Sequence, residues 1–385
     1  MAEPSTTLWD IARLFLKLGT TAFGGPAAHI AMLQREVVER RGWLSQAEFL
    51  DHLGASNLIP GPTSTELVLH IGRRRGGWPG LLVAGACFIL PAALMVGILA
   101  WAYVRYGTMP AVAGLLYGVK PVVIAVVLQA LWKLGRSAIK TRWLAVVALI
   151  ALGLSAMEVS PLAVLAVGGT LGLASTIREL RTSASVLAWA GARSALPATA
   201  AATAATTAIS AGLWPILLVF AKIGAMVFGS GYVLLVFLRA ELVERHGWLT
   251  QQQLLDAVAV GQVTPGPVFT TATFLGYLLR GTPGAIAATV GIFLPAFVLV
   301  AVSAPLIPKI RASRTAGAAL DGVNVASVAL MAVVTWQLAR SAIVDWQTLA
   351  LAVLSALLLF SFPRLNAAWL VVGAGLLGVV KCSFL

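Results

Sequence analysis

Long apolar runs separated by short polar segments dominate the chain. Five of these runs contain at most one charged residue: 81–104, 111–132, 143–157, 285–307 and 346–361. Several approach the ~20 residues that a membrane-spanning helix needs. The runs lack the alternation, over about ten residues, that is typical of strands in a membrane barrel. The pattern therefore predicts an all-α, polytopic membrane protein.

Composition agrees with this prediction. Of 385 residues, 59% are hydrophobic and 11% are charged, whereas soluble domains carry about a quarter charged residues. The first ten residues contain Glu3 and Asp10 and no basic segment, so we expect no cleavable signal peptide. The net charge of +13 lies between apolar runs, which favours loops facing an anionic lipid leaflet over nucleic-acid binding.

The second half of the chain repeats the first. At a constant offset of 205 residues, Lys17 returns as Lys222 and Pro60-Gly61-Pro62 as Pro265-Gly266-Pro267. After a single-residue gap the offset becomes 204, and Leu90-Pro91-Ala92 returns as Leu294-Pro295-Ala296. One register kept over so many residues predicts two tandem modules, 8–180 and 212–385, joined by an Ala/Thr-rich segment at 181–211.

Basic residues predict that the two modules lie in opposite orientations. In the first module Arg73, Arg74 and Arg75 follow the second apolar segment, whereas in the second module Lys309 and Arg311 follow the third. Because cytoplasmic loops collect positive charge, this exchange indicates inverted repeats, a feature of secondary transporters. An extra crossing at about 195–212 gives about thirteen membrane spans. Parallel modules remain the alternative.

The Pro-Gly-Pro units are the first candidate site. Two prolines beside a glycine interrupt a helix, and an interruption within a membrane lines a cavity or is buried in protein. Pro62 can start a half-helix whose N-terminus suits an anion, and Thr63 and Glu66 have the spacing of a capping box. A structural kink is the alternative. The candidate substrate-binding residues here are Asn57, Pro60, Gly61, Pro62, Thr63, Ser64 and Thr65, with Thr264, Pro265, Gly266, Pro267 and Thr270 in the second module.

Glycine corners and two lysines are further candidates for substrate binding. Gly24 and Gly25 interrupt the first apolar segment of module one, as Gly229 and Gly231 do in module two. Their backbone amides could bind an anion, or the glycines could serve helix packing. Lys17 and Lys222 precede these corners and could neutralise a dianion or reach the membrane interface.

Charged side chains provide candidates for gating and coupling. Glu36 and Arg40, and their counterparts Glu241 and Arg245, can form pairs one helical turn apart. Glu66 can carry a proton if it is buried, and its counterpart is Thr271, so any coupling proton is expected in the first module. We find no metal-ligand spacing, no cofactor motif, no ATP site and no nucleophile–base arrangement, so we expect a secondary transporter and not an enzyme.

The motifs resemble those of the chromate ion transporter family, in its long-chain, two-domain ChrA-type form. They are Phe23-Gly24-Gly25-Pro26, the segment from Glu36 to Leu44, and Asn57-Leu58-Ile59-Pro60-Gly61-Pro62-Thr63, with counterparts in the second half. One departure is Ser230, where glycine is expected. The resemblance implies chromate efflux across the inner (plasma) membrane of a bacterium and resistance to chromate.

The residues alone indicate only a tetrahedral oxyanion, so sulfate or another oxyanion remains an alternative substrate. Sulfate and protons are the candidate coupling ions, and the oligomeric state stays open. A membrane-embedded redox enzyme that reduces chromate is the alternative from another class. It would need a flavin, haem or thiol site, and no such site is apparent in the sequence.

Overall fold

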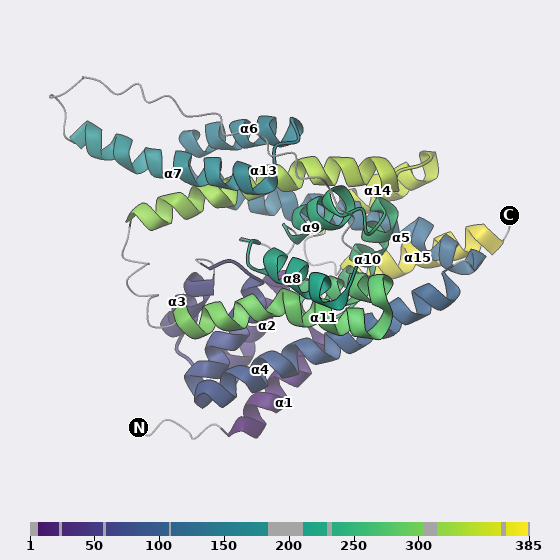
Figure 1. The fold of residues 1–385 in the computed structure, drawn as a ribbon, viewed down its shortest axis with the longest axis horizontal. Helices are drawn as coiled ribbons and strands as arrows, with labels where there is room; N and C mark the ends of the chain where they lie inside the picture. The colour runs from purple at the N-terminus through teal and green to yellow at the C-terminus, as the bar shows by residue number, and fades with distance from the viewer. Residues whose placement is uncertain are drawn as a thin grey trace.

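The computed structural model describes residues 7–22, 25–56, 59–107, 109–183, 211–228, 233–303, 314–362 and 367–383. Within these ranges every regular element is a helix (Figure 1), which confirms the predicted all-α class. The first half contains α1 (Leu8–Thr21), α2 (Gly25–Gln34), η1 (Arg35–Arg40), α3 (Gln46–Ser56), α4 (Thr63–Tyr106), α5 (Pro110–Ala138), α6 (Arg142–Ala156) and α7 (Pro161–Ser183). The second contains α8 (Leu213–Gly224), α9 (Leu234–Leu238), η2 (Arg239–Arg245), α10 (Gln251–Val263), η3 (Val268–Thr270), α11 (Thr271–Ser303), α13 (Arg314–Ala342), α14 (Trp346–Ser361) and α15 (Ala367–Ser383).

The order of the elements repeats. Helix α8 corresponds to α1, α10 to α3, α11 to α4, and α13, α14 and α15 to α5, α6 and α7. Even the π-helical segment is duplicated, as η1 and η2. The two tandem modules are therefore present in the fold as well as in the sequence. The crossing predicted at 195–212 falls almost entirely outside the described residues, and the count of about thirteen spans stays a prediction.

Helix α4 doubles back on itself. Gly77 has φ +61°, and a Cβ built on Gly80 would collide with the carbonyl oxygen of Gly72. In a straight helix these two glycines would be about 12 Å apart along the axis. The helix therefore consists of a short arm that begins at Thr63 and a long arm that follows Gly77. Helix α11 repeats this turn at Gly281.

The equivalent helices run antiparallel to one another, as inverted repeats require. Gly85, early in the long arm of α4, contacts Phe297, late in the long arm of α11. Trp101 and Ile286, from the opposite ends of those arms, line one cleft. The pair α5 and α13 is antiparallel as well: Gly135 lies near Val328 at the midpoint of α13, and Lys140, just after α5, pairs with Asp321 nearer the start of α13.

The two modules are interlocked. Helix α5 of the first packs on α14 and α15 of the second, and α13 of the second packs on α6 and α7 of the first (Figure 1). Small residues allow these close approaches: Gly118 lies against the backbone of Ala374, and Gly168 against that of Gly322. The paired α5 and α13 also contact each other.

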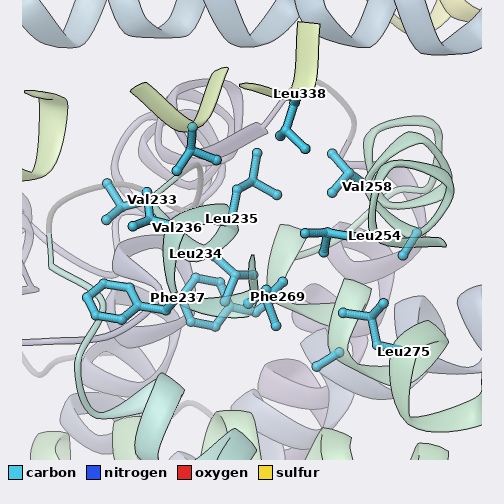
Figure 2. Close-up of a cluster of buried hydrophobic side chains, with 14 of the residues drawn as sticks. Val233, Leu234, Leu235, Val236, Phe237, Leu254, Val258, Phe269, Leu275 and Leu338 are labelled. Atoms are coloured by element: carbon cyan, nitrogen blue, oxygen red, sulfur yellow. The ribbon is translucent and has the colours of Figure 1, made fainter. Parts of the chain in front are cut away.

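Apolar side chains fill the centre and also cover much of the outside. Figure 2 shows a buried cluster to which α9, α10, η3, α11 and α13 contribute, with Leu235, Val258 and Phe269 among its members. On the surface, large apolar side chains such as Leu94, Trp101 and Trp336 are at least half exposed, as expected for lipid contact. Among the described residues, four helices are long and apolar enough to span a membrane: Thr63–Tyr106, Ala111–Ala138, Val268–Val302 and Gly317–Ala342.

Candidate functional site

The two Pro-Gly-Pro units meet in a reciprocal crossing. The Gly61 N–H donates a hydrogen bond to the Val227 carbonyl (2.7 Å), and the Gly266 N–H donates one to the Ala22 carbonyl (2.9 Å). Ala22 and Val227 are equivalent residues, each immediately before the glycine corner of its module. Each module therefore holds the interrupted helix of the other. We call these two Pro-Gly-Pro units, with Ala22 and Val227, the crossing.

The glycines of the crossing satisfy backbone and packing constraints together. Gly61 has φ +143° and Gly266 has φ +90°, conformations that L side chains rarely adopt. A Cβ on Gly61 would collide with Oε1 of Glu66, and one on Gly266 would lie 2.5 Å from Cβ of Ala92. Gly61 in turn lies near Ala296, the counterpart of Ala92. Both units therefore press against the middle of the other module's long arm.

The short arm of α4 begins directly at the crossing. Pro62 occupies the N-cap without a side-chain cap bond, so Thr63 is the first helical residue. The predicted half-helix is confirmed, but the predicted capping box of Thr63 and Glu66 is wrong. The physical reason is that Pro62, and not Thr63, is the N-cap, so Thr63 is already the first residue inside the helix. Glu66 is then the fourth helical residue, one position beyond the third residue whose side chain bonds the N-cap N–H in a capping box. Its carboxyl lies toward Gly61 instead. In the second module a single 3₁₀ turn, η3, leads into α11.

The two modules differ in how their buried polar groups are bonded. The hydroxyls of Thr264, Thr270 and Thr271 all donate to carbonyls of their own segment. In the first module, Oγ1 of Thr65 and both carboxyl oxygens of Glu66 are buried without a hydrogen-bond partner among the described residues. Buried groups of this kind normally have partners. Of the two segments that follow the Pro-Gly-Pro units, the start of α4 therefore has the unpartnered polar atoms that a ligand could bind.

His29 links the start of α4 to the crossing. Its Nε2 lies 3.0 Å from the carbonyl oxygen of Ala22, and its Nδ1 lies 3.5 Å from the hydroxyl of Ser64. The imidazole is 2% exposed. This side chain was not singled out by the sequence, because a lone histidine has no spacing that distinguishes a core residue from a site residue.

The two predicted lysines form ion pairs. Nζ of Lys17 lies 3.0 Å from Glu36, and Nζ of Lys222 lies 2.5 Å from Glu241. The predicted pairs one turn apart are confirmed as well, with Arg40 at 2.8 Å from Glu36 and Arg245 at 3.5 Å from Glu241. Each glutamate thus forms ion pairs with basic side chains from two elements of its module. A role for either lysine in binding substrate stays a prediction.

Lys222 also lines a cleft of roughly 690 Å³ together with Arg239 and Arg245.

Four predicted site residues, Gly24, Asn57, Gly229 and Gly231, lie outside the described residues, and Gly25 is the first residue of α2. The other predicted binding residues, apart from the two lysines, lie in or directly beside the crossing.

A further polar cluster joins the modules and was missed by the sequence analysis. Lys120 of α5 pairs with Asp256 of α10 (2.9 Å), and the Tyr103 hydroxyl donates to the same carboxylate (2.8 Å). The two charged side chains are 13% and 5% exposed. A signal existed, since Lys120 is the one charged residue in the apolar run 111–132. Its partner lies 136 positions away, so no local pattern could identify it.

Comparison with known proteins gives one family. A family described as "Chromate transporter" matches twice, over residues 9–173 and 214–379. The "Chromate transport protein" of Cupriavidus metallidurans is 34% identical over 99% of this chain and 95% of its own length. A second "Chromate transport protein", of Pseudomonas aeruginosa, is 34% identical over 94% of this chain and 90% of its own. The "Probable chromate transport protein" of Synechococcus elongatus is 34% identical over 86% and 84%. No solved structure matches.

Proposed function

The chain belongs to the chromate transporter family, and on this premise we propose that it exports chromate across a bacterial plasma membrane and so confers chromate resistance. The relatives are named as transport proteins, which favours transport over the redox-enzyme alternative. The observation that supports a site is the reciprocal crossing, in which Gly61 and Gly266 bond to the opposite module.

A tetrahedral dianion needs hydrogen-bond donors to replace its hydration. The start of α4 offers the backbone N–H groups of its first turn, which have no acceptor within the helix, and the positive end of the helix dipole. Beside it stand the hydroxyls of Ser64 and Thr65, both buried. Because the crossing joins both modules at the middle of their long arms, motion of one module against the other would open it to alternate sides of the membrane.

Glu66 sets the condition for anion binding. Its carboxyl is 0% exposed and lies against Gly61. An ionised carboxylate there would repel a dianion, whereas the protonated group can donate a hydrogen bond to it. Chromate and a proton therefore bind together, and the net charge that crosses falls from two negative charges to one. Protons are thus the proposed coupling ion, carried in the direction of the anion.

The membrane potential can drive such export. Moving one elementary charge across 100 mV is worth about 2.3 kcal/mol, and a bacterial interior is negative. The single net negative charge of the chromate–proton pair is therefore expelled. No ATP site is required for this direction of transport.

Flux into proteoliposomes tests the proposal. Purified protein is reconstituted, a potassium–valinomycin potential that is positive inside is imposed, and uptake of labelled chromate is measured. We expect potential-dependent accumulation above the external concentration and its loss in a variant in which Pro60, Gly61 and Pro62 are all alanine. Equal uptake by empty liposomes would contradict the proposal, and normal uptake by a correctly inserted triple variant would remove the crossing as the site.

Sulfate has the same charge and shape as chromate, and the residues of the crossing do not distinguish the two. A parallel arm therefore measures labelled sulfate under the same potential. Faster sulfate than chromate uptake at equal concentration would make sulfate the substrate.

A further inference from the structure

A row of titratable side chains leads away from the crossing in the first module. Glu66 and His70 are one turn apart on the same face of α4. The rings of His70 and His52 stack at a centroid distance of 5.6 Å and an angle of 27°. His52 is in turn one helical turn from Glu48 on α3. The row thus runs from a carboxyl that is 0% exposed to one whose side chain is 45% exposed.

The inner members of this row carry buried polar atoms that have no hydrogen-bond partner among the described residues. Nε2 of His70 and both carboxyl oxygens of Glu66 are buried and accept or donate no hydrogen bond among the described residues. His70 is 2% exposed. A buried imidazole nitrogen without a partner is costly in a purely structural position. This nitrogen is therefore available to accept or donate a proton.

The outer end of the row is anchored at the surface. Glu48 accepts hydrogen bonds from the Ser45 backbone N–H (2.8 Å) and hydroxyl (2.9 Å), which lower the pKa of its carboxyl. Arg74 lies 3.7 Å from the same carboxylate. Glu48 is therefore ionised at neutral pH and holds a solvent-facing negative charge next to His52.

The charged groups around the row come from the helices packed against it. The charges of Arg74, Glu48 and Asp51 interact electrostatically with the His52 ring. Arg73 acts on His70, but its guanidinium donates to carbonyls of α11 and lies over Trp78. Within the described residues no charged group acts on Glu66, and His29 of α2 contacts Ser64 instead.

The second module has no such row. At the positions of Glu66, His70, His52 and Glu48 it carries Thr271, Leu275, Ala257 and Gln253. The duplicated fold is therefore built without these titratable groups, and Leu275 and Ala257 are fully buried in it. The row is a property of the first module and not a requirement of its packing.

We propose that Glu48, His52, His70 and Glu66 form a proton path between the surface beside the Arg73–Arg75 turn and the crossing. The proposal rests on the proposed function, because the proton is the one that accompanies the oxyanion. A proton from water at Glu48 is taken up by the His52 ring, passes to His70, and is delivered to the Glu66 carboxylate. Both rings return to the neutral form, so one proton is moved. Because the Arg73–Arg75 turn carries the cytoplasmic charge excess, the proton enters from the cytoplasm.

The test exchanges the two histidines for the residues of the second module. His70→Leu and His52→Ala are made singly and together in the full chain, and Asp321→Asn serves as a control because it removes an exposed carboxylate paired with Lys140 outside the row. The proteins are reconstituted with a trapped pH dye. Net chromate flux, the accompanying proton flux, and exchange of labelled for unlabelled chromate at equal concentrations are measured.

In the wild type and in Asp321→Asn, chromate leaving the liposomes is expected to carry protons with it. In the histidine variants the proton-coupled net flux falls by about tenfold or more, while chromate–chromate exchange, which needs no net proton movement, is unchanged. Proton flux at the wild-type rate overturns the path, and so does an equal fall of net flux and exchange, which would indicate a structural role. Wild-type transport of chromate without protons overturns the path and leaves chromate export standing.

A second measurement applies even if chromate itself is not moved, in which case the proposed function fails separately. The infrared band of the protonated Glu66 carboxyl, assigned by Glu66→Gln, shifts on transfer into D₂O. Its exchange is expected to slow by about tenfold in the double histidine variant. An unchanged exchange rate, or the absence of any such band across the accessible pH range, overturns the proposal.

Discussion

Gly61 and Gly266 each meet three structural requirements at one position. Each adopts a positive φ, has no room for a Cβ, and donates its N–H across the interface between the modules. The flanking prolines have no N–H to donate, so the glycine supplies the one backbone donor of the triplet. Any other residue would strain the backbone and separate the two units.

Substitution of these glycines by alanine is expected to destabilise the protein. Gly61→Ala and Gly266→Ala should each lower the free energy of unfolding by about 1–3 kcal/mol, because of the disfavoured φ and the collisions of the new Cβ. Gly153→Ala is the control, since a Cβ there meets nothing within 4 Å in the helical α6. Thermal unfolding in detergent measures the effect, and equal midpoints for Gly61→Ala and Gly153→Ala would contradict the geometry.

Single residues also mark the limit of reading this sequence. The break at Pro60-Gly61-Pro62 could be predicted, because proline chemistry acts locally. The partner of the Gly61 N–H could not, because Val227 is 166 positions away. The capping box failed for a local reason: the motif fits Thr63 and Glu66 by spacing, but Pro62 is the N-cap, so the helix starts one residue earlier than the motif needs.

Among the elements, α5 and α10 are held together by charge inside the protein. Lys120, Asp256 and Tyr103 form a nearly buried group that joins the two modules. The second module's counterpart of Lys120 is Asn324, so the pair exists once. Removing one partner of a buried pair leaves the other charge uncompensated in a medium of low polarity.

Asp256→Asn is therefore expected to be strongly destabilising, by about 3–5 kcal/mol, whereas Lys120→Met combined with Asp256→Leu should recover much of that loss. A double-mutant cycle of Lys120→Met, Asp256→Leu and their combination, built from unfolding free energies in detergent, measures the coupling. If Asp256→Asn and the double variant lose equal stability, the ion pair has no special contribution and α5 is held to α10 by packing alone.

The elements themselves were largely predictable, since helix type and the tandem repeat follow from composition, apolar runs and a constant offset. The lengths and internal turns of the helices were harder to predict. The doubling back of α4 depends on the contact of Gly72 with Gly80 around Gly77. In the sequence these glycines flank or follow Arg73–Arg75 in one short segment, and nothing in that segment shows how sharply the chain turns.

For the whole molecule, antiparallel packing of equivalent helices implies that equivalent turns face opposite sides of the membrane. Trp78 and Thr282 follow the two turns, are equivalent at offset 204, and are both exposed. In a background without Cys87 and Cys382, Trp78→Cys should react with an impermeant maleimide from the cytoplasmic side and Thr282→Cys from the external side. Labelling of intact cells and everted vesicles distinguishes them. Reaction of both cysteines from one side would mean parallel modules.

The interlocked packing of α5 with α15 sets the timing of assembly during synthesis. When α5 leaves the ribosome, roughly 240 residues remain to be made before its partner α15 is complete, which takes roughly 10–50 s at ordinary translation rates. During that interval the groove around Gly118, which later receives the backbone of Ala374, faces lipid or the insertion machinery. Helices α6 and α7 likewise remain without their packing partner until α13 has been synthesised. The first half is thus a membrane-inserted intermediate that completes its packing only when the C-terminal helices of the same chain have been synthesised.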